Sequence, residues 1–155
     1  MQPYTIHPPF FLLRSLERCW RCNEVARVFA FAASRCTTSD EELEDYIPLG
    51  GPFMLYNALD LPADLVEFAR ELGASIQRRY SKTAETEYYM NLCHCGAPFG
   101  DYFMFNEPGH AFFPTSEEEA AMIEIFQLPL PHPVGVDSGF TESDLSLIFE
   151  CGIRR

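Results

Sequence analysis

Six cysteines are the residues in this sequence best suited to chemistry, and four of them form two close pairs. Cys19 and Cys22 are separated by two residues, and Cys93 and Cys95 by one. Short spacing lets two sulfurs turn toward one ion, and two such pairs supply the four thiolates of a tetrahedral zinc site. Gly96 follows the second pair and allows the backbone to turn tightly there. The spacing therefore predicts a zinc site formed by these four cysteines.

A site made of four cysteines predicts a structural rather than a catalytic metal. Four thiolates fill the coordination shell, whereas a catalytic zinc keeps one position open for water. The ion would join the two pairs, and its binding energy would become folding energy. Arg18 and Arg21 flank the first pair and would offset part of the negative charge of the centre. On this interpretation the protein is not an enzyme.

Other roles for the thiols remain open at the level of sequence. The second pair is one residue shorter than the commonest zinc-binding turn, so His94 is an alternative ligand in place of one cysteine. A lone Cys-x-x-Cys can be a redox dithiol, but here a second pair exists, and no thioredoxin-like pattern surrounds the first. Cys36 and Cys151 are expected to be free, buried thiols, because a disulfide between them is not expected in a reducing cytoplasm.

The composition indicates one folded domain that carries a large negative charge. The chain has 155 residues, 47% of them hydrophobic, which is enough for a core and excludes wholesale disorder. No apolar run approaches the roughly 20 residues of a membrane-spanning helix, and no basic, apolar leader opens the chain. We therefore expect a cytoplasmic protein that does not contact membranes. The formal net charge of −12 argues against a simple duplex-binding surface.

The charge is distributed unevenly along the chain. Residues 83–153 contain 12 acidic residues and no lysine or arginine. Glu117, Glu118 and Glu119 form the densest acidic run there, and they are the candidate contacts for a basic partner. Arg78, Arg79 and Lys82 form a basic cluster earlier in the chain. We expect a dipolar molecule, with one face suited to a partner of opposite charge.

Apolar periodicity and capping residues place these motifs on helices and strands. Asp60 can cap a helix over residues 60–73, and Ser116 with Glu119 has the spacing of a capping box at the start of a helix over residues 115–126. Residues 39–46 suit either one helical turn or a loop. Strands are expected over residues 25–32, 53–56, 74–80, 87–92 and 101–106. The prediction is an α+β fold, with a small antiparallel sheet around the zinc site and about two helices packed on it.

The order of these motifs resembles that of small bacterial zinc-ribbon proteins of uncharacterised function. The resemblance covers about residues 15–114. It implies a zinc-ribbon core over that range with a helical insertion at 60–73, but no activity. Residues 115–155 would be an acidic C-terminal extension of the same single domain, 1–155. The matching segments are Cys19-Trp-Arg-Cys22, Arg79-Tyr-Ser-Lys-Thr83, Tyr89-Met-Asn91, Cys93-His-Cys-Gly96, Gly100-Asp-Tyr-Phe103, Glu107-Pro-Gly109 and Phe112-Phe-Pro114.

Two functions follow from these features. The first is a non-enzymatic zinc-ribbon protein that acts as a protein-interaction module, such as an adaptor or an immunity-type inhibitor of a basic partner, because opposite fields speed association. The alternative is nucleic-acid binding through Arg78, Arg79 and Lys82, with Tyr80 positioned to stack on a base.

Overall fold

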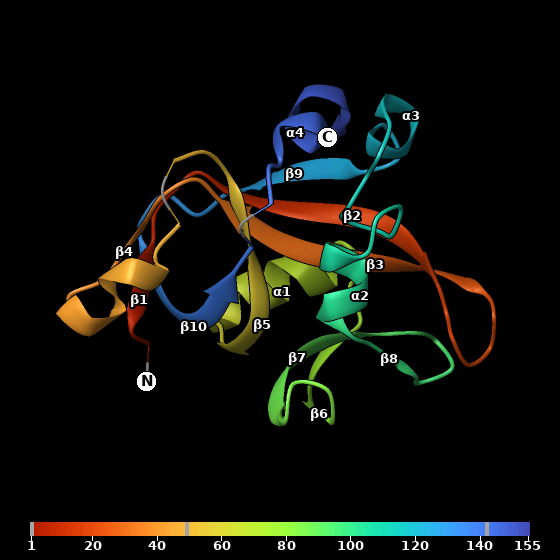
Figure 1. Ribbon diagram of the computed structural model, residues 1–155, viewed down its shortest axis with the longest axis horizontal. Coiled ribbons are helices and arrows are strands. Elements are labelled where there is room, and N and C mark those ends of the chain that lie inside the picture. Colours follow the sequence, from red (N-terminus) through yellow and green to blue (C-terminus); the bar gives the residue numbers. More distant parts are fainter. Residues whose placement is uncertain (1, 49, 142) are drawn as a thin grey trace.

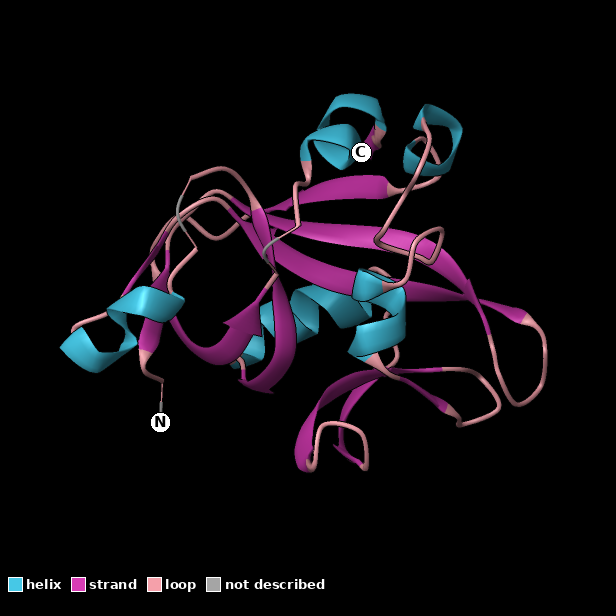
Figure 2. Cartoon of the chain, in the orientation of Figure 1, coloured by secondary structure: helices cyan, strands magenta, loops and turns pink. Residues whose placement is uncertain are grey.

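The computed structural model describes residues 2–48, 50–141 and 143–155, and strands dominate it (Figures 1 and 2). The strands are β1 Tyr4–Ile6, β2 Phe10–Arg18, β3 Val25–Ala33, β4 Cys36–Thr37, β5 Phe53–Asp60, β6 Ile76–Ser81, β7 Thr86–Leu92, β8 Pro98–Phe99, β9 Glu124–Leu128, β10 Val134–Phe140 and β11 Ile153–Arg154. The helices are the 3-10 helix η1 Glu41–Tyr46 and the α-helices α1 Ala63–Glu71, α2 Asp101–Asn106, α3 Glu117–Ala120 and α4 Ser146–Cys151.

The larger sheet has eight strands in the order β11-β9-β2-β3-β5-β10-β1-β4. Its centre is the long hairpin β2–β3, paired from Phe11↔Ala32 to Arg18↔Val25. Strand β9 returns from late in the chain and pairs antiparallel with β2, and β11 pairs parallel with β9. Strand β10 lies between β5 and β1. Segments far apart in the sequence therefore build one sheet around the hairpin that carries the first cysteine pair.

Both faces of the hairpin are buried along Phe10–Leu13 of β2 and Val28–Ala33 of β3, because side chains there alternate between two separate cores. Phe10 and Leu12 belong to one core, whereas Phe11 and Leu13 belong to the other. Helix α1 packs in the first core, and α2, α4 and the cysteine pairs lie at the second. Side chains of a strand alternate between the faces of a sheet, so a strand buried on both faces is apolar at nearly every position.

A smaller sheet, β6-β7-β8, carries the second cysteine pair between β7 and β8. It is joined to the larger sheet by the buried side chain of Asn91. The Asn91 Oδ1 atom accepts a hydrogen bond from Phe29 N at 2.8 Å, and its Nδ2 donates to Phe29 O at 2.9 Å. Strand β5 pairs with β3 only at Ala32 and Ala33. Phe29 lies outside that short ladder, so its N–H and C=O pair with the side-chain amide of Asn91 instead of with β5.

The mixed content of helices and strands agrees with the prediction, but the sheet is not small and the described residues hold five helices, not two. One correction concerns Asp101–Asn106, which was predicted as a strand and forms helix α2. Its aromatic residues favour strands in general. The buried residues are Asp101, Met104 and Phe105, however, and spacings of three and four residues place them on one face of a helix.

A second correction concerns residues 115–126, which do not form one helix. Helix α3 spans only Glu117–Ala120, and β9 begins at Glu124. The predicted start is right, since the Ser116 hydroxyl accepts a hydrogen bond from Glu119 N at 3.1 Å. The chain then leaves the helix because Ile123 and Ile125 are buried in the second core, beside β2.

Three further predictions are confirmed in outline. Residues 25–32 lie in β3, residues 39–46 contain the helical turn η1, and α1 lies within the range 60–73. Asp60 does not cap α1, however, because it ends β5, and Pro62 occupies the N-cap position. In the described part of the chain, the helices fall short of the length and apolar character needed to cross a bilayer.

Candidate metal centre

The first cysteine pair lies in the tight turn between β2 and β3. Cys19 follows the last residue of β2, and its N–H donates to the carbonyl of Glu24 at 2.8 Å. Asn23 closes the turn with a left-handed backbone, φ 64°, and its N–H donates to the carbonyl of Cys19 at 3.0 Å. The N–H of Arg21 donates to the sulfur of Cys19 at 3.4 Å. The turn therefore holds the Cys19 sulfur in place through a backbone N–H.

The second pair lies in a similar turn between β7 and β8. The N–H of Cys93 donates to the carbonyl of Ala97, and the N–H of Gly96 donates to the carbonyl of Cys93, both at 2.8 Å. Gly96 has φ 91°, a left-handed conformation that glycine adopts without strain. The two turns also touch, because the indole N–H of Trp20 donates to the carbonyl of Pro98 at 2.8 Å.

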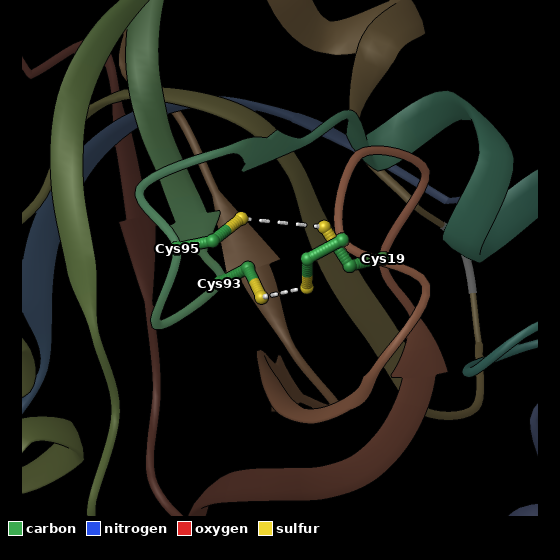
Figure 3. Close-up of side chains that lie close together, drawn as sticks. Cys19, Cys93 and Cys95 are labelled. Atoms are coloured by element: carbon green, nitrogen blue, oxygen red, sulfur yellow. Dashed lines mark hydrogen bonds between the residues drawn. The ribbon is translucent and has the colours of Figure 1, made fainter.

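The four sulfurs converge on one point between the two turns, as Figure 3 shows. The sulfurs of Cys19 and Cys95 are 3.7 Å apart, and those of Cys22 and Cys93 are 3.6 Å apart. All four lie within 4.8 Å of one another. Four sulfurs bound tetrahedrally at 2.3 Å to one ion would be about 3.8 Å apart. The predicted clustering is confirmed, and its geometry fits a single metal ion.

Because the four thiols are close together and largely shielded from water, several of them cannot be deprotonated at once without a cation. The amides of Cys22 and Arg21 donate to the sulfur of Cys19 and lower the pKa of that thiol to about 6. At Cys22 the amide of Glu24 acts to lower the pKa, but burial and the neighbouring thiols outweigh it and raise the pKa to about 12. A cation between the sulfurs removes this conflict, because a metal binds thiolates and displaces their protons.

The other candidate ligands and cysteines lie outside the four-thiol cluster. His94 turns its Nε2 atom toward Glu24, with 2.6 Å between Nε2 and a carboxylate oxygen. Its Nδ1 atom is 3.6 Å from the sulfur of Cys93. Cys36 and Cys151 are both free thiols, and Cys36 is buried in the first core as predicted. Cys151 is only partly buried, so the prediction of burial is wrong for it. The four cysteines therefore make up the cluster without the histidine.

The charged candidate residues lie on two separate exposed segments, one on the β6–β7 hairpin and one at α3 (Figure 1). Arg78, Arg79 and Lys82 are exposed, and Arg78 lies 3.7 Å from Glu87. Glu117, Glu118 and Glu119 are exposed at the start of α3. The Glu119 carboxylate accepts hydrogen bonds from the amide and hydroxyl of Thr115, and these bonds lower its pKa.

Sequence reasoning missed Glu24, which comes directly before β3 and meets His94 from the other turn. It also missed the burial of Asp101, a carboxylate that accepts a hydrogen bond from Asn57 N at 2.8 Å. Burial raises the pKa of Asp101 to about 7, although the amide of Asn57 acts to lower it. No local signal marks Glu24. The spacing of Asp101 to Met104 and Phe105 was the available signal for a buried carboxylate.

Comparison of the chain with family models, curated proteins and solved structures finds no match. The features of this chain that bear on its function are therefore the four-thiol cluster and the surfaces around it.

Proposed function

We propose that the four-thiol cluster binds one structural zinc ion and that the protein is a zinc-ribbon interaction module without enzymatic activity. The distances between the sulfurs are the main support for this proposal. The separations of 3.6 and 3.7 Å between sulfurs of the two turns match the value of about 3.8 Å for a tetrahedral zinc ion bound by four thiolates. Four protein ligands leave no position for a substrate or a reactive water. The ion would therefore hold the β2–β3 and β7–β8 turns together, which are contributed by two different sheets.

The face proposed to bind a partner surrounds α3, and we call it the α3 face: Leu16, Glu117, Glu118, Glu119 and Met122. Leu16 and Met122 are exposed by 43% and 59%, and they line one shallow hollow together with Glu119. Apolar side chains at the centre of a patch and charged ones around it are typical of protein interfaces. The glutamates give this face the charge to attract a basic partner.

The metal part of the proposal is tested by the native mass of the protein purified under reducing conditions. A zinc ion bound by the four-thiol cluster, retained by Cys36→Ser and lost by Cys19→Ser or Cys95→Ser, is the expected result. A chain that binds no zinc, or a Cys19→Ser variant that keeps both its zinc and its melting temperature, would contradict the proposal.

The partner part is tested by gentle isolation of the tagged protein from its native cells at low salt. A basic protein should co-purify in a defined ratio, and its affinity should fall as salt rises. The double variant Glu117→Lys, Glu118→Lys should weaken the complex by at least about 10-fold, since a reversed charge repels the same partner. Glu41→Lys with Glu42→Lys, in the exposed acidic turn η1, is the matched control. Equal affinity for both double variants would show that the α3 face is not the interface.

Nucleic-acid binding through the β6–β7 hairpin is the second candidate, favoured by the exposure of consecutive residues of β6. Tyr80 is 64% exposed beside the exposed Arg79 and Lys82. Arg78→Ala with Arg79→Ala should weaken binding to a single-stranded oligonucleotide and reduce its salt dependence. Absence of binding to single- or double-stranded oligonucleotides at low salt would remove this candidate.

A further inference from the structure

Beside the four-thiol cluster lies a second group of potential metal ligands, Cys22, Glu24 and His94. The Cys22 sulfur, a Glu24 carboxylate oxygen and a His94 ring nitrogen all lie within 4.8 Å of one another. Cys22 and Glu24 come from the β2–β3 turn, and His94 comes from the β7–β8 turn. The group exists only because the two turns meet.

This group is open to solvent, unlike the four-thiol cluster. The side chains of His94 and Glu24 are 60% and 67% exposed. Cys22 belongs to both groups and is itself partly exposed, whereas Cys19 and Cys93 are buried. A cation can therefore reach this group from solvent.

The donor atoms suit a zinc-class ion. Thiolate, imidazole and carboxylate are the three ligand types that zinc takes in proteins. Nε2 of His94 and the Glu24 oxygen are now 2.6 Å apart. Around a tetrahedral zinc ion they would be about 3.3 Å apart, so the two exposed side chains need to separate by only about 0.7 Å.

The other ring nitrogen of His94 has the partner that a metal-bound histidine needs. A ligating histidine almost always donates its second ring N–H to an acceptor, which sets the tautomer and the ring orientation. Nδ1 of His94 lies 3.6 Å from the sulfur of Cys93. Nδ1–H can therefore donate to that sulfur while Nε2 binds a cation.

The charge of the neighbouring centre favours a second cation. A zinc ion with four thiolates has a net negative charge, and Glu24 adds another carboxylate beside it. A thiolate sulfur keeps further lone pairs after it binds one metal, so Cys22 can bridge two ions. Each added positive charge lowers the repulsion between these anionic groups.

We propose that Cys22, Glu24 and His94 form a second, solvent-open zinc site that shares the Cys22 thiolate with the four-thiol centre and holds a water as its fourth ligand. This inference rests on the proposed zinc centre for the shared thiolate. It goes beyond that centre because three protein ligands leave a coordination position open, which the four-thiol cluster does not.

The test is a titration of the reduced, full-length chain with Zn²⁺, followed by native mass and by competition with a chelator. The wild-type chain should bind two ions, and the chelator should remove one of them first. His94→Ala and Glu24→Gln should each weaken the second ion by at least about 10-fold and leave the first ion in place. His110→Ala is the matched control, because His110 forms a similar contact of 2.9 Å with Glu17. It should bind both ions like the wild type.

Each other outcome identifies what has failed. A wild-type chain that binds one ion, lost only when a cluster cysteine is replaced, would refute the second site and leave the zinc centre standing. A second ion unaffected by either variant would lie elsewhere and would also refute the proposal. Loss of both ions in a folded Glu24→Gln variant would show one shared site instead of two. No bound ion at all would overturn the zinc centre as well.

Discussion

Replacing Asn91 by leucine is expected to destabilise the protein, because Asn91 is the polar link between the two sheets. Leucine has a similar size but neither donates nor accepts a hydrogen bond. Asn91 and Phe29 are 4% and 3% exposed, so water cannot replace the lost partner. The N–H and C=O of Phe29 would then remain buried without the bonds of 2.8 and 2.9 Å that they now make.

The size of the effect follows from these two groups. A buried peptide group left without its partner costs about 1–3 kcal/mol, and the apolar gain of leucine offsets part of the total. We expect Asn91→Leu to lower the free energy of unfolding by about 3 kcal/mol. For a chain of this length that corresponds to a fall of about 6–12 °C in Tm. Asn91→Asp should be at least as harmful at pH 7, because a carboxylate cannot donate to the carbonyl of Phe29.

Urea unfolding of the reduced, zinc-loaded protein measures this change. Gln77→Leu is the matched control, since Gln77 is an exposed amide on β6 in the same small sheet. Its free energy of unfolding should stay within about 0.5 kcal/mol of the wild type. If Asn91→Leu also stays within that range, the bonds to Phe29 do not hold the sheets together and the reasoning fails.

Three further predictions concern the metal centre and two acidic side chains. Cys93→Ser should release the metal and lower the free energy of unfolding by at least about 3 kcal/mol, whereas Cys36→Ser should keep the metal; elemental analysis and thermal melts decide this. The guanidinium of Arg14 lowers the pKa of Glu124 to about 2, so about 1–2 kcal/mol of stability present above pH 4.5 should be lost as pH falls toward 2, and Glu124→Gln should flatten that part of the profile. Burial raises the pKa of Asp101 to about 7. The stability that depends on a protonated Asp101 is therefore fully present below pH 4, and about 2–4 kcal/mol of the free energy of unfolding should be lost as pH rises to 7 and above. An Asp101→Asn variant whose free energy of unfolding, measured with urea, falls with pH as steeply as that of the wild type would contradict this.

Local patterns predicted well wherever neighbours in the sequence decide the structure. Strand β3 and the Ser116 cap of α3 were both visible in short stretches, because side-chain alternation and capping depend on residues only a few positions apart. The same local reasoning failed for Asp101–Asn106, where aromatic composition outweighed the spacing of its buried positions. It also extended α3 too far, since pairing with β2 determines where β9 begins.

The sequence by itself determined the four thiols and their pairing into two short turns. Two cysteines within four residues can face one point without help from the rest of the fold, so their spacing predicted each pair. The two pairs meet in one cluster through tertiary contacts between cysteines 71 and 76 positions apart. Only the tertiary structure decided that His94 lies outside it and meets Glu24, and that Asn91 joins β7 to β3. Those contacts connect residues 62 to 70 positions apart. They depend on how two sheets pack, which no local spacing encodes.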